Sequence, residues 1–345
     1  MPDFMQAAVL YGKEDVRVEA IGVPAVGPGD LLVRVRAALT CGTDVKVFRR
    51  GYHARMIVPP SVFGHELAGE VVAAGSAVTA FRAGERVVAA NSAPCGVCFY
   101  CVHKQPNLCE DLLFNNGAYA EYIRIPSRIV ERNTYLLPDH LGFSDAALME
   151  PLACVVKGLN DTGAQPGDSV AVIGLGPIGM MFVKLALRLG ARVLAVGRRT
   201  AQVDRAISMG AHEGIVSEDP DRAVAQVRAL TGRGCDIAIE AVGKPDVWTT
   251  AVRMLRRGGK VNFFGGCPSG TEVALPTELL HYSELTCLAS FHHTPASNRE
   301  ALDAIASGHV TARDFVGDEE PLREVPAVLR RLSRENGVLK TAILP

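Results

Sequence analysis

A glycine pattern that follows an apolar run constrains the fold of this chain more than any other feature. Gly174, Gly176 and Gly179 form G-x-G-x-x-G in VAVIGLGPIGMMFV, with Pro177 and Ile178 between the last two glycines. The apolar residues before the pattern predict a buried strand, and those after it predict a helix. This context supplies a tight turn, a close backbone approach and a helix N-terminus for a pyrophosphate. The pattern therefore predicts a dinucleotide site.

Short apolar runs alternate with helix-length stretches through residues 168–266, as in SVAVIGLG, MMFVKLALRLG, RVLAVG and CDIAIEAVG. This alternation predicts an α/β domain of Rossmann type, with a parallel sheet and right-handed crossovers. Residues 1–150 instead carry short β-branched runs broken by Gly and Pro, which predict a mostly β unit without a long helix. We expect a Rossmann domain over 156–289, and a second domain formed by 1–155 together with 290–345.

The end of the second Rossmann strand bears on the choice of cofactor. NAD-selective sites carry an acidic residue there, which binds the ribose 2′-hydroxyl. This sequence reads VLAVGRRT, with Gly197 at that place and Arg198 and Arg199 beside it. A missing carboxylate leaves space, and two guanidinium groups favour an additional phosphate. We expect NADP(H) to be preferred. In the alternative, the arginines cover the adenine or point to solvent, and NAD(H) is used.

The charge balance excludes some classes of partner. Lys and Arg number 36 against 37 Asp and Glu, so no overall positive field exists to hold nucleic acid or an anionic membrane. The N-terminal stretch MPDFMQAAVLYGKEDVRVEA shows neither a secretory signal nor a membrane-spanning helix. We therefore expect a cytoplasmic protein, in which clustered cysteines indicate metal binding or catalysis before disulfides.

Four cysteines lie close together in NSAPCGVCFYCVHKQPNLCED, with the spacing C-x2-C-x2-C-x7-C. Four thiolates can surround one ion as a tetrahedron, and sulfur ligands suit zinc or iron. An iron–sulfur cluster is the competing interpretation, but the x7 gap and the lack of a second set favour zinc. A closed shell leaves no open position, so we expect a structural zinc in a lobe over about 91–112. Its ligands would be Cys95, Cys98, Cys101 and Cys109.

A second set of possible ligands is spread along the chain. It comprises Cys41 in TCGTD, His65 and Glu66 in FGHELAG, and Glu150 in LMEPLAC. One thiolate, one imidazole and one or two carboxylates form a mixed shell with room for an exchangeable ligand, as a catalytic zinc requires. Spacing alone leaves open that these residues are structural.

TCGTD, GHE, the four-cysteine lobe, MEPL and the glycine pattern occur in this order over nearly the whole chain. In this they resemble the zinc-dependent medium-chain alcohol dehydrogenases, especially the branch of polyol and threonine dehydrogenases. The resemblance implies a GroES-like catalytic domain and a catalytic zinc held by Cys41 and His65, with Glu66 and Glu150 as exchanging ligands. It further implies that Thr43 carries the substrate proton towards solvent and that Lys340 contacts the cofactor pyrophosphate.

The resemblance implies a small alcohol or ketone substrate, hydride transfer to or from the cofactor, and a homodimer or homotetramer. The stretch ASFHHTP has Ser290 and Phe291 where sorbitol dehydrogenases carry an Arg-Tyr pair, and Lys46 stands where threonine dehydrogenases carry His. A secondary alcohol or polyol is therefore expected without a named substrate. The basic side chains of Arg49, Arg50, His53 and Arg55 could attract a phosphorylated or carboxylated substrate, or could form a solvated basic loop.

Other functions remain as alternatives. A threonine-type or sugar-phosphate-type dehydrogenase using NAD stays within the same chemistry. A zinc-free quinone or enone reductase of the same superfamily would lack the cysteine and GHE features that this chain has. A non-catalytic NADP-binding sensor or structural protein would keep the fold and lose turnover, and the presence of all four candidate residues Cys41, Thr43, His65 and Glu66 argues against it.

Overall fold

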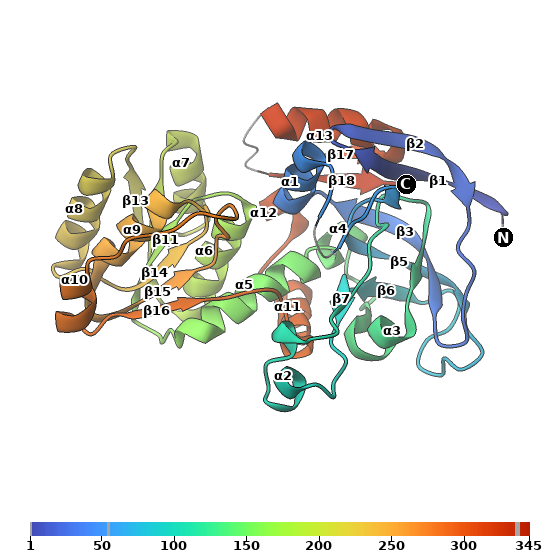
Figure 1. Cartoon of the computed structure of the whole chain (residues 1–345), viewed down its shortest axis with the longest axis horizontal. Coiled ribbons are helices and arrows are strands. Elements are labelled where there is room, and N and C mark those ends of the chain that lie inside the picture. The colour runs from blue at the N-terminus through green and yellow to red at the C-terminus, as the bar shows by residue number, and fades with distance from the viewer. Residues whose placement is uncertain (1, 54–55, 335–338) are drawn as a thin grey trace. The chain divides into compact units, whose positions relative to one another are not determined.

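The computed structural model describes residues 2–53, 56–334 and 339–345, and the chain forms two compact units (Figure 1). The first unit joins Met1–Ala153 to His293–Pro345, and the second is Cys154–His292. The boundaries expected from the sequence differ from these by a few residues. Among the described residues, no helix is long and apolar enough to cross a membrane.

The first unit is built on a mixed sheet whose central strand, β3 (Leu31–Leu39), reads LLVRVRAAL. Only its two arginines are exposed, because the rest of the strand packs into the core. The strand order is β10-β6-β5-β3-β18-β17, and β9 also pairs with β3. The last strand of the chain, β18, pairs with β3 through Ala342 and Leu39, so the C-terminal segment completes this sheet. The other strands are β5 (Glu66–Ala74), β6 (Arg86–Ala89), β9 (Tyr122–Ile125), β10 (Thr134–Leu136), β17 (Val316–Pro321) and β18 (Lys340–Leu344).

Two smaller sheets and several short helices surround this sheet. The order β2-β1-β4 forms one small sheet, and β7 with β8 forms the other. These strands are β1 (Phe4–Gly12), β2 (Asp15–Gly22), β4 (Ser61–Val62), β7 (Ser92–Ala93) and β8 (Leu113–Phe114). The helices of the unit are α1 (Gly42–Arg50), α2 (Phe99–Val102), α3 (Ser127–Asn133), α4 (Phe143–Ala146), α11 (Pro295–Ala306), α12 (Ala312–Phe315) and α13 (Val325–Arg334), with 3-10 turns at η1 (Pro106–Leu108) and η2 (Leu322–Glu324). Helix α5 (Met149–Thr162) begins in this unit and ends in the next.

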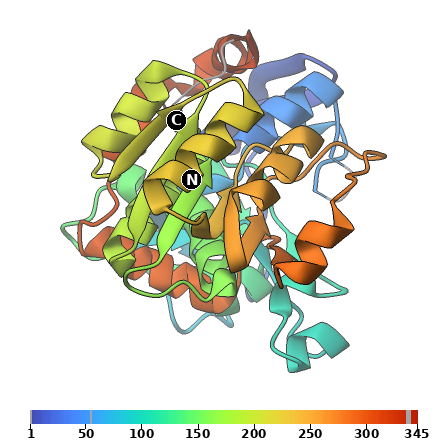
Figure 2. The same ribbon diagram turned by 90° about the vertical axis from the view of Figure 1, so that its left-hand side faces the viewer.

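The second unit contains a parallel six-stranded sheet in the order β13-β12-β11-β14-β15-β16. This is the order of a doubly wound dinucleotide-binding fold, with the switch point between β11 and β14. Figure 2 turns this unit towards the viewer. The strands are β11 (Ser169–Ile173), β12 (Arg192–Gly197), β13 (Glu213–Val216), β14 (Cys235–Glu240), β15 (Leu255–Phe263) and β16 (Thr286–Ala289). The helices are α6 (Pro177–Leu189), α7 (Thr200–Ser208), α8 (Pro220–Thr231), α9 (Pro245–Met254) and α10 (Thr277–Tyr282).

The central strands β11 and β12 are apolar after their first residue because helices cover them. In β11 and β12 every residue except the first is buried, and α6 and α7 pack on β12. The expected combination of a mostly β domain with a Rossmann domain is confirmed. In the second unit, the candidate cofactor-binding residues lie at the edge where β11, β12 and β14 end. In the first unit, the candidate metal ligands lie at the junction of β3, α1 and β5.

Candidate active site and metal centres

The first candidate ligand, Cys41, is held by the start of helix α1. Cys41 is the N-cap residue, and its sulfur accepts a hydrogen bond from the Thr43 backbone N–H at 3.4 Å. In return, Asp44 Oδ2 accepts the Cys41 backbone N–H at 2.9 Å. This reciprocal capping pattern satisfies backbone donors that a helix start leaves unpaired, and it fixes the thiol and the carboxylate relative to each other. The local sequence TCGTD therefore builds one corner of the site.

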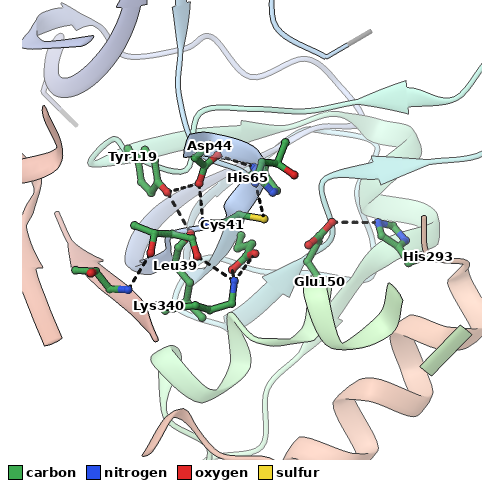
Figure 3. Close-up of polar contacts among 12 residues, drawn as sticks. Leu39, Cys41, Asp44, His65, Tyr119, Glu150, His293 and Lys340 are labelled. Carbon is green, nitrogen blue, oxygen red and sulfur yellow. Dashed lines mark hydrogen bonds and ion pairs between the residues drawn. The ribbon is translucent and has the colours of Figure 1, made fainter. Parts of the chain in front are cut away.

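The second corner comes from the start of strand β5. Gly64 has φ +86°, a conformation that side chains rarely adopt, and it turns the chain immediately before His65. Glu66 then pairs with Leu39 at the end of β3, which brings the GHE segment next to TCGTD. The ligand atoms of Cys41, His65 and Glu66 all lie within 4.8 Å of one another. Figure 3 shows Cys41 and His65 next to each other.

The Asp44 carboxylate sets the orientation and the pKa of the His65 imidazole. Asp44 Oδ1 lies 3.1 Å from His65 Nδ1, and both side chains are almost fully buried. Burial disfavours the imidazolium, but the adjacent carboxylate outweighs it and holds the pKa of His65 well above its ordinary value. A carboxylate in contact with Nδ1 orients a metal-binding imidazole and leaves Nε2 for the ion.

Cys41 is tuned towards its thiolate form. Burial raises the pKa of its thiol, but the contact with His65 outweighs burial and brings the value down to about 7. A thiolate, an imidazole and a carboxylate together form a donor set that suits a catalytic zinc. The residues present therefore fit the ion that the sequence implies.

The Glu66 carboxylate, besides lying next to Cys41 and His65, forms a buried ion pair with Lys340. Lys340 Nζ donates to Glu66 Oε1 at 2.7 Å, to Glu66 Oε2 at 2.8 Å and to the Thr40 carbonyl at 2.9 Å. Glu66 is fully buried and Lys340 is 3% exposed. Three acceptors match the three N–H groups of the ammonium. The Lys340 ammonium is thus bound to Glu66 and Thr40 in the first unit, whereas the resemblance implies a contact with the cofactor pyrophosphate.

Glu150 lies beside the Cys41, His65 and Glu66 group, in the first turn of α5, and faces His293 (Figure 3). Its Oε1 is 4.0 Å from His293 Nε2, which in turn lies 3.0 Å from Asn91 Oδ1. Burial raises the pKa of Glu150 to about 7. The three-residue group therefore forms the first candidate shell, with Glu150 next to it.

Of the residues in this network, Asp44 was not predicted from the sequence, whereas His293 belongs to a histidine pair that could line the cleft or be structural. Asp44 could have been found, since it stands three residues after Cys41 at the place of the acidic partner in a capping box. His293 carries no such local signal. Of the basic residues near α1, Arg49 and Arg50 are exposed, and Arg55 lies outside the described residues.

The four-cysteine lobe has the geometry of a tetrahedral thiolate site. The sulfur atoms of Cys95 and Cys101 are 3.9 Å apart, and those of Cys98 and Cys109 are 3.8 Å apart. A tetrahedron with Zn–S bonds of about 2.3 Å has edges of about 3.8 Å. Backbone N–H groups also point at the sulfurs, such as Cys98 N to Cys95 Sγ at 3.3 Å and Cys95 N to Cys109 Sγ at 3.2 Å. The four thiols therefore fit one zinc.

In the second unit, each of the three glycines of the pattern is required for a different structural reason. Gly174 has φ +95° in the turn after β11. A Cβ on Gly176 would meet nothing within 4 Å, which leaves the backbone open to a ligand. A Cβ on Gly179 would lie 1.8 Å from the Gly174 carbonyl oxygen, so strand and helix pack too closely for any side chain. Pro177 is the first residue of α6 and Ile178 is half-buried. This is the turn that a pyrophosphate requires.

At the end of β12, Gly197 is buried, and Arg198 and Arg199 are exposed. A Cβ on Gly197 would lie 3.1 Å from Leu175 Cδ1 and 3.2 Å from Val203 Cγ2, so an acidic side chain has little room there. Arg199 is the N-cap residue of α7, whose first turn carries no acidic residue.

Glu240, at the end of β14, is a further residue that the sequence analysis missed. Its side chain is fully buried, and Oε1 accepts the backbone N–H groups of Val242 at 2.8 Å and Gly243 at 2.9 Å. Burial raises the pKa of this carboxyl to about 7. Glu240 therefore shapes the turn at the switch point, where β11 and β14 end side by side.

Comparison with known proteins identifies the family to which this chain belongs. The family model "Alcohol dehydrogenase GroES-like domain" matches residues 27–138, and the model "Zinc-binding dehydrogenase" matches residues 177–307. The chain is 31% identical to a sorbitol dehydrogenase of Bacillus subtilis over 100% of this chain and 98% of that protein. It is 35% identical to an L-threonine 3-dehydrogenase of Bacillus licheniformis, over 73% of each protein.

Solved structures agree along the whole chain. An alcohol dehydrogenase of Thermus sp. ATN1 superposes with a TM-score of 0.88 at 32% identity, covering 99% of both chains. A structure from Sinorhizobium meliloti 1021 with bound NADP superposes with a TM-score of 0.90 at 31% identity, covering 100% of both chains. The chain therefore belongs to the zinc-dependent medium-chain alcohol dehydrogenase family and is a dehydrogenase that acts on CH–OH groups.

Proposed function

We propose that this chain transfers hydride reversibly between NADP(H) and a secondary alcohol or polyol, with two zinc ions per chain. The catalytic ion would be held by Cys41 and His65 together with Glu66 or Glu150, and the structural ion by the four-cysteine lobe. The observation that carries the proposal is the convergence of the Cys41 thiol with the buried His65 imidazole and Glu66 carboxylate, whose ligand atoms lie within 4.8 Å of one another.

The roles of the protein residues follow from their contacts. A zinc ion in such a site acts as a Lewis acid, which lowers the pKa of an alcohol and assists hydride loss from its carbon. Cys41 and His65 bind the ion, and Asp44 orients His65 through the 3.1 Å contact with Nδ1. Thr43 is half-buried in the first turn of α1, and we assign its hydroxyl to carry the substrate proton towards solvent. In the second unit, the turn from Gly174 to Gly179 binds the pyrophosphate.

Two observations support NADP(H) over NAD(H). The end of β12 offers Arg198 and Arg199 and little room for a carboxylate at Gly197. The similar structure from Sinorhizobium meliloti 1021 was solved with NADP. NAD(H) is the alternative cofactor, and it would be used if the two arginines pointed to solvent instead of binding a phosphate.

The substrate class is drawn from the relatives. Curated relatives include sorbitol dehydrogenases and enzymes named probable D-xylulose reductase, which favour a polyol and its ketone. L-threonine is the second candidate, favoured by the 35% identity to an L-threonine 3-dehydrogenase. Nine free cysteines, five of them in the proposed zinc sites, suit a reducing compartment, and we place the enzyme in the cytoplasm.

The test combines metal analysis with turnover. Zinc content and cofactor absorbance would be measured with NADP and NAD on sorbitol, xylitol, 2,3-butanediol, sugar phosphates and L-threonine. We expect two zinc ions per chain and NADP-dependent turnover of a polyol or secondary alcohol. Cys41→Ser should lose one zinc and more than about a hundredfold in kcat, whereas Cys287→Ser, in the second unit, should lose neither. Turnover with NAD alone would reject the cofactor assignment. Wild-type protein without turnover on any substrate would support the non-catalytic alternative.

A further inference from the structure

Tyr119 lies behind the candidate zinc shell, and its hydroxyl hydrogen-bonds to Asp44 and Leu39 rather than to a proposed ligand. Its side chain is fully buried, and its hydroxyl lies 2.6 Å from Asp44 Oδ2 and 3.2 Å from the Leu39 carbonyl oxygen (Figure 3). A phenol has one hydrogen to donate. The shorter contact and the charge of the acceptor assign that hydrogen to Asp44, because hydrogen bonds to ionised acceptors are the shorter and stronger ones.

The Asp44 carboxylate contacts both of the proposed zinc ligands Cys41 and His65. Its Oδ2 accepts from the Tyr119 hydroxyl and from the Cys41 backbone N–H at 2.9 Å, while its Oδ1 lies 3.1 Å from His65 Nδ1. The carboxylate is fully buried, so no solvent can replace a lost donor. Removing the hydroxyl would leave Oδ2 with one donor, and the carboxylate could then rotate away from His65.

The ring of Tyr119 fixes the backbone that carries His65. A Cβ on Gly64 would lie 2.8 Å from Tyr119 Cγ, so the glycine packs directly against the ring. Tyr119 N donates to the Phe63 carbonyl at 2.9 Å, and the Phe63 and Tyr119 rings meet edge to face with centroids 6.0 Å apart. The ring thus sets the path of the chain into His65, and the hydroxyl sets the carboxylate that orients its imidazole.

We propose that Tyr119 is a positioning residue for the catalytic zinc: through Asp44 it holds His65 in its metal-binding orientation, and so it slows loss of the ion. The inference rests on the proposed zinc site at Cys41 and His65. It separates two functions of one side chain, because phenylalanine would keep the ring contacts with Gly64 and Phe63 and lose only the hydroxyl.

The test is zinc release from the holoenzyme in the presence of a chromogenic chelator. Tyr119→Phe should release one of the two zinc ions about 10- to 100-fold faster than wild type, the range for loss of a hydrogen bond behind a ligand. Release of the second ion, from the four-cysteine lobe, should be unchanged. Tyr122→Phe is the matched control, because Tyr122 is also buried in the first unit and its hydroxyl contacts Arg34 at 3.0 Å.

Further readouts exclude a merely structural effect. The absorption bands of the cobalt-substituted enzyme should shift in Tyr119→Phe and not in Tyr122→Phe, since they report the ligand field. Asp44→Asn should also speed release, and the double variant should add little to it, because both changes break one link. Wild-type release rates and spectra in Tyr119→Phe, or fully additive effects in the double variant, would overturn the proposal. If wild type itself held zinc only in the four-cysteine lobe, the proposed function would fail together with this inference.

Discussion

Arg198 lies exposed at the end of β12, next to the buried Gly197, and the preference for NADP(H) depends on it. A guanidinium that binds a phosphate contributes about 1.5 to 3 kcal/mol, or roughly 10- to 100-fold in affinity. Arg198→Ala should therefore raise the dissociation constant of NADPH by that factor and leave that of NADH nearly unchanged, as measured by fluorescence titration. Arg233→Ala is the control, since Arg233 is exposed just before the start of β14, away from the strand ends that bind the cofactor. Equal weakening of both cofactors would contradict the assignment.

Glu240 makes the stability of the second unit depend on pH. Burial raises the pKa of its carboxyl from 4.5 to about 7, so the folded chain keeps a proton that the unfolded chain has released. The proton favours folding below pH 4.5, and this contribution is lost as the pH rises towards 7. Its size is at most about 3 kcal/mol. Glu240→Gln should therefore flatten the fall in Tm between pH 5 and pH 8, measured by calorimetry. Glu278→Gln, at an exposed glutamate, should leave the slope as it is.

Single residues also differ in how far the sequence could place them. The three glycines at 174, 176 and 179 follow from the motif, because each role is set by local backbone geometry. Asp44 is also local, since it caps the helix that Cys41 starts. Lys340 is different: its partner Glu66 is 274 positions away along the chain, so no local pattern could show that the ammonium is used within the first unit.

At the scale of an element, the four-cysteine lobe depends on its metal for structure. Between Cys95 and Cys109 it contains only the four residues of α2 and the three of η1 as regular structure. A segment with so little regular structure needs its ligand bonds to stay ordered. Cys98→Ser should reduce the zinc content from two ions to one and should speed tryptic cleavage at the exposed Lys104. Zinc analysis and timed proteolysis would measure both effects.

The matched variant for the lobe is Cys287→Ser, on β16 in the second unit. It should keep both zinc ions and the wild-type cleavage rate. A Cys98→Ser protein that retained two zinc ions would show that the lobe is not the structural site. An intact cleavage rate after zinc loss would show that the lobe is ordered without its metal.

Helices and strands with a clear local pattern of apolar residues were predictable from the sequence. Pairings between strands far apart along the chain were not. The apolar run before Gly174 and the helix after it appear as β11 and α6. The pairing of β18 with β3, in contrast, joins the end of the chain to residue 39, and its register depends on which faces are buried in the finished sheet. The sequence therefore predicted the mostly β character of the first unit without its strand order.

At the scale of the whole molecule, the exposed edge of the second sheet bears on assembly. Strand β16 pairs only with β15 in the described chain, and Thr286, Cys287 and Ala289 are exposed. Edge strands of monomeric proteins are commonly blunted by lysine or proline, and β16 carries neither. Tyr282 nearby is 75% exposed. We therefore expect two copies of the chain to pair through β16.

Light scattering coupled to size-exclusion chromatography tests this pairing. The wild-type mass should be two or four times the chain mass of 36.7 kDa. Cys287→Lys places a charge on the exposed face of the edge strand, so it should halve the assembly mass or make it depend on protein concentration. Val216→Lys is the control, because Val216 lies on β13, the opposite edge of the same sheet. A wild-type monomer at every concentration would reject assembly, whereas dissociation by Val216→Lys alone would move the interface to β13.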